Sequence, residues 1–342
     1  MIKKLLVINK KSAMPILKSK KGFFFTFLAI MLVSILLIIF IKTPAAQSQK
    51  QSETVKIKVN LMNDFMLTLK NSYIPRILYF SAKEVLINFS RTEDPSIFQD
   101  STGPANKPID VFGTVFADNM SGQLNPLLLQ ISTISLSKLN IYSEINMSSF
   151  TLVQQDPWTL QVSGLYSIYI RSNESDIIFN VTQQNVSVLI PIDGFEDPLF
   201  ARKAKLFSTN ETTRIIKKSS NLHWDKDITA AFYQNKQYRE STNAPSFLDR
   251  VKGNYQSSSF GIETLIDPIT YTPNANGYAD IDYKFFTPIS DCKYNSTDKS
   301  VVSNLYEIKY IQSGFYLDVE HIGKYNLTDQ IGAPYSCPPP GP

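Results

Sequence analysis

Residues 159–170 read TLQVSGLYSIYI, and apolar side chains recur there among polar or small ones. The next two segments, DIIFNV (176–181) and NVSVLIPI (185–192), have the same character and are separated only by Thr-Gln-Gln. Alternation with a period of two residues is typical of a β-strand with one buried and one solvated face. Three such segments in succession predict an antiparallel sheet whose outer face is exposed to water.

Glycosylation is predicted from Asn-x-Ser/Thr sequences, which occur at about twice the frequency expected by chance for this composition. Asn180 and Asn185 fall on the predicted strands, where a glycan requires the exposed face. The nine acceptor residues are Asn88, Asn119, Asn146, Asn173, Asn180, Asn185, Asn210, Asn295 and Asn326.

An amphipathic helix is predicted upstream of the strands, because apolar residues recur there at steps of three and four. They are Met62, Phe65, Met66, Leu69, Tyr73, Ile77 and Phe80. Pro75 is expected to kink or divide this helix. With the polar segment TPAAQSQKQSET before it, the region 43–90 is expected to be a juxtamembrane spacer and helix. Residues 91–109 contain three prolines and are expected to form a loop.

A membrane helix is predicted at residues 22–42, because GFFFTFLAIMLVSILLIIFI (22–41) is uncharged and reaches about 30 Å as a helix. Residues 1–42 carry eight of the 34 Lys and Arg residues and none of the 30 acidic ones. This bias places the basic leader 1–21 in the cytoplasm and the rest of the chain outside the cell. It also means that the basic charge gives no reason to expect a nucleic-acid partner. A cleaved secretory signal is the alternative, although its apolar region is usually only about 7–15 residues long.

The remaining chain is expected to form two extracellular regions. Asp193-Gly194 and Asp197-Pro198 mark a turn at which the composition changes. We therefore expect a β-rich domain at 91–200 and a second α+β region at 201–342. The fold class predicted for the whole chain is α+β, with a transmembrane helix that continues into an amphipathic helix.

Cys292 and Cys337 are the only cysteines in the chain. A disulfide between them would close the C-terminal part and would be stable outside the cell. Two unpaired buried thiols are the alternative.

Residues capable of catalysis are few. The chain has no nucleotide-binding glycine loop, nucleophile elbow, zinc-protease helix or C-x-x-C pair. His223 and His321 are the only histidines, and neither is expected to be catalytic. The pairs Asp225/Asp227 and Asp280/Asp282 have the spacing of a divalent-metal pair, but we expect solvated carboxylates. No enzyme activity, metal or cofactor is therefore predicted.

The N-terminal junction resembles the class III signal of type IV pilin-like proteins. Lys20, Lys21 and Gly22 precede Phe23 and an apolar helix. The resemblance implies cleavage between Gly22 and Phe23 by a prepilin-type peptidase on the cytoplasmic side. Bacterial pilins usually carry Glu at the fifth mature position, where this chain has Phe27. Archaeal members commonly lack that Glu, so the resemblance is to the archaeal proteins.

Four further segments resemble those of uncharacterised archaeal membrane-anchored, pilin-like surface proteins. They are QQDPW (154–158), DGFEDPLF (193–200), APSFLDRVKG (244–253) and FGIETL (260–265). The resemblance implies a non-enzymatic, single-pass cell-surface glycoprotein for filament assembly, adhesion or envelope organisation. Its expected partners are the membrane and other pilin-like subunits or surface proteins. The alternatives are a type II membrane-anchored glycosyltransferase and an anchored binding protein that never assembles.

Overall fold

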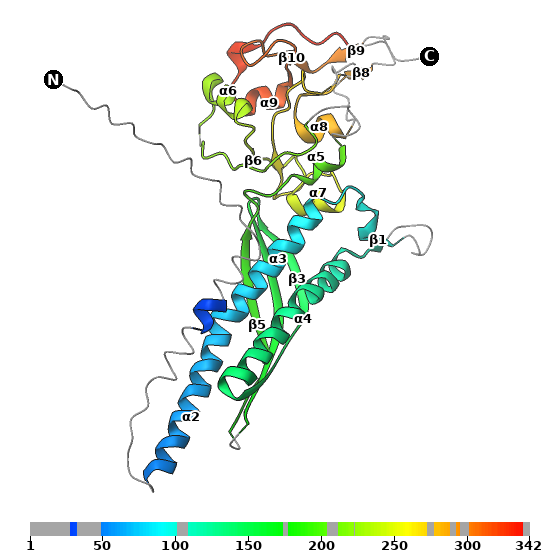
Figure 1. Ribbon diagram of the computed structural model, residues 1–342. Helices are drawn as coiled ribbons and strands as arrows, with labels where there is room; N and C mark the ends of the chain where they lie inside the picture. Colours follow the sequence, from blue (N-terminus) through cyan, green and yellow to red (C-terminus); the bar gives the residue numbers. More distant parts are fainter. Residues whose placement is uncertain are drawn as a thin grey trace, which may run out of the picture.

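The computed structural model describes most of the chain from residue 49 onwards. The described residues are 28–32, 49–100, 109–173, 177–203, 211–221, 223–271, 277–287, 292–294 and 301–337. They form an α+β structure with two parts (Figure 1). Residues 49–191 make an elongated stalk of helices and one long sheet, and residues 192–337 make a head at one end of it.

The predicted amphipathic helix is present as one nearly continuous rod. It consists of α2 (Gln49–Thr68), a π-helical turn (Leu69–Tyr73) and α3 (Ile74–Ser90). Pro75 lies in the first turn of α3. A proline has no N–H to donate and its ring collides with the carbonyl of the fourth residue before it. The wider π-helical turn directly before Pro75 accommodates both effects, so the helix continues where a kink or a break was expected.

An antiparallel three-stranded sheet is present as predicted, but two of its strands differ from the expectation: the segments 176–181 and 185–192 form the single strand β5, and β3 was not predicted. Strands β3 (Ile141–Asp156), β4 (Thr159–Ser172) and β5 (Ile178–Pro191) pair in the order β3-β4-β5, each antiparallel to its neighbour. One face of β4 is fully buried, with Leu160 and Ile168 both inaccessible to solvent. The alternation seen in the sequence therefore separates a core face from an outer face.

A long helix that the sequence analysis did not predict precedes the sheet. Helix α4 (Phe112–Leu139) occupies the first part of the region expected to be β-rich, 91–200. Its buried residues follow steps of four and three: Phe112, Phe116, Met120, Leu124, Leu128, Ile131 and Ser135. This buried stripe is narrow, and Ser, Thr, Asn, Gly and the internal Pro126 on the other sides obscure it.

Short elements also interrupt the loop expected at 91–109. They are the 3-10 turn Pro95–Phe98 and the paired strands β1 (Gln99–Asp100) and β2 (Ile109–Asp110). Residues between these two strands are outside the described part of the chain.

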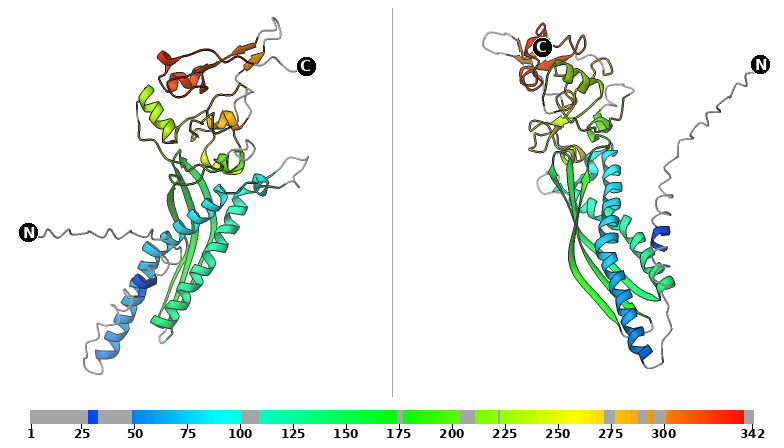
Figure 2. Two further views of the ribbon diagram at one scale, coloured as in Figure 1. Left: turned by 45° about the horizontal axis from the view of Figure 1, so that its top comes forward. Right: turned by 90° about the vertical axis from the view of Figure 1, so that its left-hand side faces the viewer.

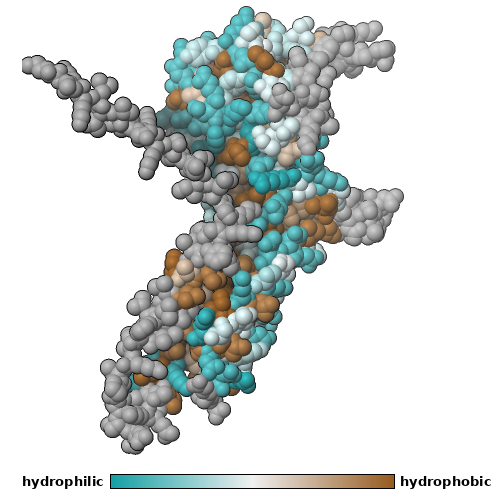
Figure 3. Space-filling model, viewed as in Figure 1, coloured by the Kyte–Doolittle hydropathy of each residue, from teal (hydrophilic) through white to brown (hydrophobic). Residues whose placement is uncertain are grey.

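The helices cover one face of the sheet and leave the other open. Helix α4 packs along β3, while α3 packs along both β5 and α4. Two further views show the helices together on one side of the strands (Figure 2). From the helix side, apolar residues lie among hydrophilic ones along the stalk, and the head surface is largely hydrophilic (Figure 3).

The head consists of short helices and strands, and it begins before residue 201, where the second α+β region was expected to start. Its elements are α5 (Pro198–Lys203), α6 (Lys226–Gln234), β6 (Arg239–Glu240), α7 (Phe247–Lys252), β7 (Ile262–Glu263), α8 (Asp282–Phe286), β8 (Cys292–Tyr294), β9 (Val301–Ser303), β10 (Leu305–Glu307), β11 (Tyr316–Asp318), α9 (Val319–Lys324) and the 3-10 turn Thr328–Gln330. Aromatic contacts fill its core, as where the Phe200 ring meets the rings of Tyr271 and Phe286 edge-on. The predicted disulfide joins Cys292 to Cys337.

The predicted membrane segment lies almost entirely outside the described residues. Only residues 28–32 of it are described, and they are helical. Within the described part of the chain, no helix combines the length and the apolar character that crossing a membrane requires. The processing residues Lys20, Lys21, Gly22 and Phe23 are likewise outside it.

Candidate functional site

The four segments singled out in the sequence meet where the head joins the stalk. Arg250, from APSFLDRVKG, contacts Asp197 of DGFEDPLF through its Nη1 at 2.6 Å. The same guanidinium donates through Nη2 to the Ile262 carbonyl of FGIETL. Gln154 of QQDPW accepts a hydrogen bond from the Leu248 backbone N–H at 3.3 Å. Residues up to about 100 positions apart in the sequence are thus brought into one region.

Arg250 is the centre of this region. Its side chain is fully buried, and Nη1 also lies 2.6 Å from a carboxylate oxygen of Asp282. Burial alone would lower the pKa of Arg250, but the two carboxylates outweigh it and raise that pKa. Burial raises the pKa of Asp282 to about 6, against the opposing effect of Arg250. A permanently charged guanidinium between two buried carboxylates binds segments of the chain together.

Further contacts fasten the head to the stalk. Arg91, next to the end of α3, forms an ion pair with Glu196 at 2.6 Å. The indole N–H of Trp158, in the β3–β4 hairpin, donates to Glu240 of β6 at 2.7 Å. These contacts come from both the helix and the sheet of the stalk, which favours a fixed orientation of the head.

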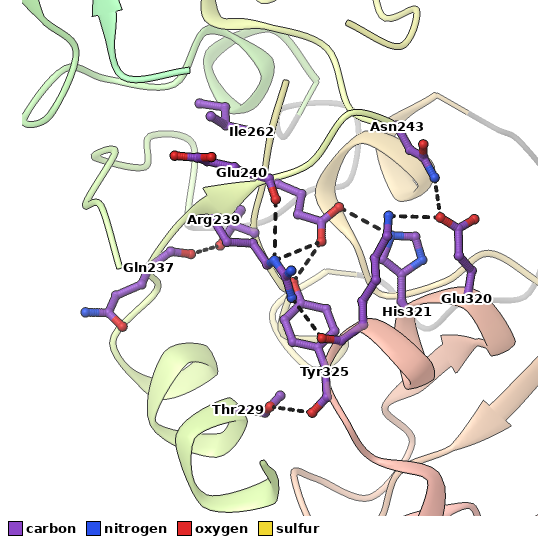
Figure 4. Close-up of polar contacts among 12 residues, drawn as sticks. Thr229, Gln237, Arg239, Glu240, Asn243, Ile262, Glu320, His321 and Tyr325 are labelled. Atoms are coloured by element: carbon purple, nitrogen blue, oxygen red, sulfur yellow. Dashed lines mark hydrogen bonds and ion pairs between the residues drawn. The ribbon is translucent and has the colours of Figure 1, made fainter. Parts of the chain in front are cut away.

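A second polar cluster lies inside the head around His321, which is fully buried on α9 (Figure 4). Its Nδ1 lies 2.7 Å from Asp318, whose carboxylate also accepts the backbone N–H of His321. Its Nε2 lies 3.3 Å from Glu263 of β7. Tyr325 donates its hydroxyl to Glu263 at 3.2 Å, and the Arg239 guanidinium stacks on the Tyr325 ring.

The His321 cluster has the partners of a catalytic histidine but not its electrostatics. Burial would lower the pKa of His321, yet the hydrogen bonds and charges of Asp318 and Glu263 raise it to about 9. Burial would raise the pKa of Glu263, but His321 holds it below its usual range. The imidazole therefore carries its proton at neutral pH and cannot accept another, as a general base must. A buried imidazolium between two carboxylates instead ties α9 to β7.

In both aspartate pairs that were considered for metal binding, the carboxylates have partners elsewhere in the protein. Asp225 caps helix α6 by accepting the Ile228 N–H, and Asp227 accepts the hydroxyl of Tyr310. Both Asp280 and Asp282 are fully buried rather than solvated as expected. Asp280 accepts the Tyr316 backbone N–H, and burial raises its pKa well above the usual range.

Neither pair offers two free carboxylates, because Asp282 is paired with Arg250 and Asp227 accepts the hydroxyl of Tyr310. In the described residues, no group of three or more His, Cys, Asp or Glu side chains is placed to hold a metal ion. His223, the other histidine, is exposed in the segment before α6.

The acceptor asparagines that the structure describes are all exposed at the surface: Asn88, Asn119, Asn146, Asn173, Asn180, Asn185 and Asn326. Asn210 and Asn295 lie outside the described residues. A glycan can be attached only to an exposed asparagine, and these residues meet that requirement.

Sequence reasoning missed the residues that organise both clusters, namely Asp197, Arg250 and Glu263. The only available signal was a charged residue inside an apolar run, as in FGIETL, which predicts a buried and paired side chain. The partners could not be read from the sequence, since Glu263 and His321 are 58 positions apart. No known protein family, curated protein or solved structure matches this chain.

Proposed function

We propose that this chain is a non-enzymatic, single-pass cell-surface protein, similar to pilins, whose stalk holds the head away from the membrane. Its role is filament assembly, adhesion or envelope organisation. The observation that carries the proposal is the helix of α2 and α3. It begins at residue 49, shortly after the predicted membrane segment 22–42, and runs to the head.

The dimensions of this helix suit a spacer. At 1.5 Å per residue, residues 49–90 extend over about 60 Å. The sheet and α4 stiffen the part of the helix nearer the head, and the Arg91–Glu196 ion pair lies where it meets the head. A head that is fixed at the end of a stiff spacer is displayed at a set distance from its anchor.

The chemistry of the head supports a role in contact rather than in catalysis. Its two buried charged clusters link segments of chain, and His321 holds its proton at neutral pH. The exposed acceptor asparagines and the Cys292–Cys337 disulfide suit an extracellular environment.

The proposal is tested by extracting the full-length protein from the membranes of its own cells. Mass spectrometry then identifies its N-terminal residue. Pilin-type processing gives a chain that starts at Phe23. Gly22→Val places a branched side chain at the cleavage point and is expected to leave Met1 in place. Ala13→Val, in the leader but away from the junction, is the matched control and should be processed normally.

External protease on intact cells tests the orientation. The head should be degraded on intact cells, and a head protected until the cells are permeabilised would overturn the proposal. A chain that starts at Met1 would leave an anchored protein that never assembles. Manganese-dependent turnover of a sugar nucleotide would replace the proposal with the glycosyltransferase alternative.

A further inference from the structure

Three acceptor asparagines lie together on the outer face of the sheet. Asn180 and Asn185 of β5 pair with Tyr169 and Leu165 of β4, and Asn146 of β3 pairs with Ser167 from the other side. Given a rise of about 3.4 Å per residue and strands about 4.8 Å apart, the three positions lie within about 15 Å of one another. All three are exposed, while their sequence neighbours Ile145, Met147, Val181 and Val186 point to the helix-covered face.

These three asparagines also differ from Asn119, Asn173 and Asn326 in what their side-chain amides contact. Within the described residues, the amides of Asn146, Asn180 and Asn185 make no hydrogen bond to the protein. The amide nitrogen of Asn326, by contrast, donates to the Trp224 carbonyl at 3.0 Å. That of Asn119 donates to the Val115 carbonyl at 2.8 Å.

The Ser or Thr residue that completes each Asn-x-Ser/Thr sequence (sequon) also differs between the sheet sites and another site. Ser148, Thr182 and Ser187 complete the three sheet sequons, and all are exposed. Ser90, which completes the sequon of Asn88, is instead fully buried and donates to the Ile87 carbonyl. The sheet sequons therefore present both the amide and the hydroxyl to solvent.

The strand that carries two of these asparagines needs protection. Among the described strands, β5 pairs only with β4, so its other edge is unpaired. Residues 178–191 include no Lys, Arg, Asp or Glu, and their only proline is the last residue. Edge strands normally carry charges or prolines, or are covered, because an open edge pairs with another chain. An irregular strand also pairs poorly with another chain, but the pairing of β4 with β5 has one register shift only, between Tyr166 and Ile168 of β4.

We propose that Asn146, Asn180 and Asn185 carry N-linked glycans that cover the outer sheet face and stop the β5 edge from pairing with a second copy of the chain. In each attachment the asparagine Nδ2 forms a bond to C1 of an oligosaccharide donated as a lipid-linked phosphate ester. The bond from C1 to the phosphate oxygen breaks, the lipid phosphate leaves, and an amide proton is released. This inference rests on the extracellular location in the proposed function.

Occupancy is tested by glycopeptide mass spectrometry on the full-length protein from its own cells. We expect glycan on the peptides that contain Asn146, Asn180 and Asn185. If other acceptor sites are modified and Asn180 and Asn185 are bare, this inference is overturned while the proposed function stands. If none of the nine sites is modified, this inference is likewise overturned, and external protease on intact cells decides separately whether the extracellular location holds.

The role of the glycans is tested by removing them without altering the asparagines. The variant Ser148→Ala/Thr182→Ala/Ser187→Ala destroys the three sequons. The matched control Ser148→Thr/Thr182→Ser/Ser187→Thr keeps them. In detergent solution, light scattering should give at least twice the wild-type protein mass for the alanine variant and the wild-type mass for the control. An alanine variant with the wild-type mass would overturn the role in edge protection.

A second variant distinguishes edge pairing from misfolding. Asn180→Lys/Asn185→Lys removes both β5 glycans but gives the edge two charges, which oppose strand pairing. We expect the protein mass of this variant in light scattering to equal that of the wild type, although both β5 glycans are absent. Association equal to that of the alanine variant would contradict pairing through the β5 edge.

Discussion

Arg250 on α7 lies 2.6 Å from Asp197, the residue that precedes α5, and neither side chain is accessible to solvent. The pair joins the first helical segment of the head to a helix some 50 residues later, beside the top of the stalk. Asp282 contacts the same guanidinium nitrogen, so one cation serves two buried anions. A cation in that position stabilises the head because removing it would leave two carboxylates without a partner.

Replacement of this cation should therefore be severely destabilising. We expect Arg250→Met to lower the free energy of unfolding by about 3–5 kcal/mol, the usual loss when one partner of a buried ion pair is removed. Urea unfolding followed by circular dichroism measures the difference. Arg171→Met is the matched control, because Arg171 is exposed on the sheet, and it should change stability by no more than about 0.5 kcal/mol. Equal losses for the two variants would contradict a central role for Arg250.

The His321 cluster should make stability depend on alkaline pH. The folded-state pKa is about 9, against the ordinary value of 6.5. The folded protein thus binds this proton more tightly, and the stabilisation is complete below about pH 6.5 and is lost as the pH rises through about 9. This pKa shift corresponds to a loss on the order of 3 kcal/mol in the free energy of unfolding.

The variant His321→Gln isolates this effect from the other groups that titrate in the same range. Asp318, Glu263, Tyr283 and Lys284 surround or border the imidazole and remain in the variant. When the pH is raised from 6.5 to 9.5, the urea concentration at the midpoint of unfolding should fall much further for the wild type than for the variant. The same pH dependence in both proteins would show that His321 is not the responsible group.

The sequence predicted those parts of the fold whose signal is local. The alternation in TLQVSGLYSIYI identified β4, and the helical spacing from Met62 to Phe80 identified the long helix. Helix α4 was not predicted, because its stripe of buried residues is narrow and Pro126 lies inside the helix. The position of Pro75 in the helix was recognised, but the expected kink or break is replaced by a π-helical turn directly before it.

The candidate site was predictable only as a set of unusual segments. DGFEDPLF, APSFLDRVKG and FGIETL each place a charge among apolar residues, which indicates a buried and paired side chain. The pairing of Asp197 with Arg250 depends on the chain path between them, and no local pattern encodes that path. The pair Asp280/Asp282 shows the opposite error, because two carboxylates that suggested a solvated face are both buried.

The disulfide should supply a measurable part of the stability of the head. Cys292 and Cys337 are 45 positions apart, and closing a loop of that length is expected to stabilise the fold by about 4 kcal/mol. Cys292→Ser/Cys337→Ser should lose that amount in urea unfolding. Reductant should lower the stability of the wild type to a similar level and leave the double variant unchanged. A wild type that is insensitive to reductant while unfolding would contradict the prediction.

Gly261 in FGIETL should tolerate no side chain. A Cβ there would lie 2.0 Å from the Ala244 carbonyl oxygen and 2.2 Å from that of Ser241, so the backbone of a neighbouring segment would have to move. Gly261 directly precedes Ile262, whose carbonyl accepts a hydrogen bond from Arg250. We therefore expect Gly261→Ala to lower the free energy of unfolding by about 3 kcal/mol.

Gly113→Ala in α4 is the matched control, since a Cβ there meets nothing within 4 Å, and alanine favours a helix by up to about 1 kcal/mol. Thermal unfolding of the two variants should therefore move in opposite directions from the wild type, and a stable Gly261→Ala protein would show that the Ala244 segment is free to shift.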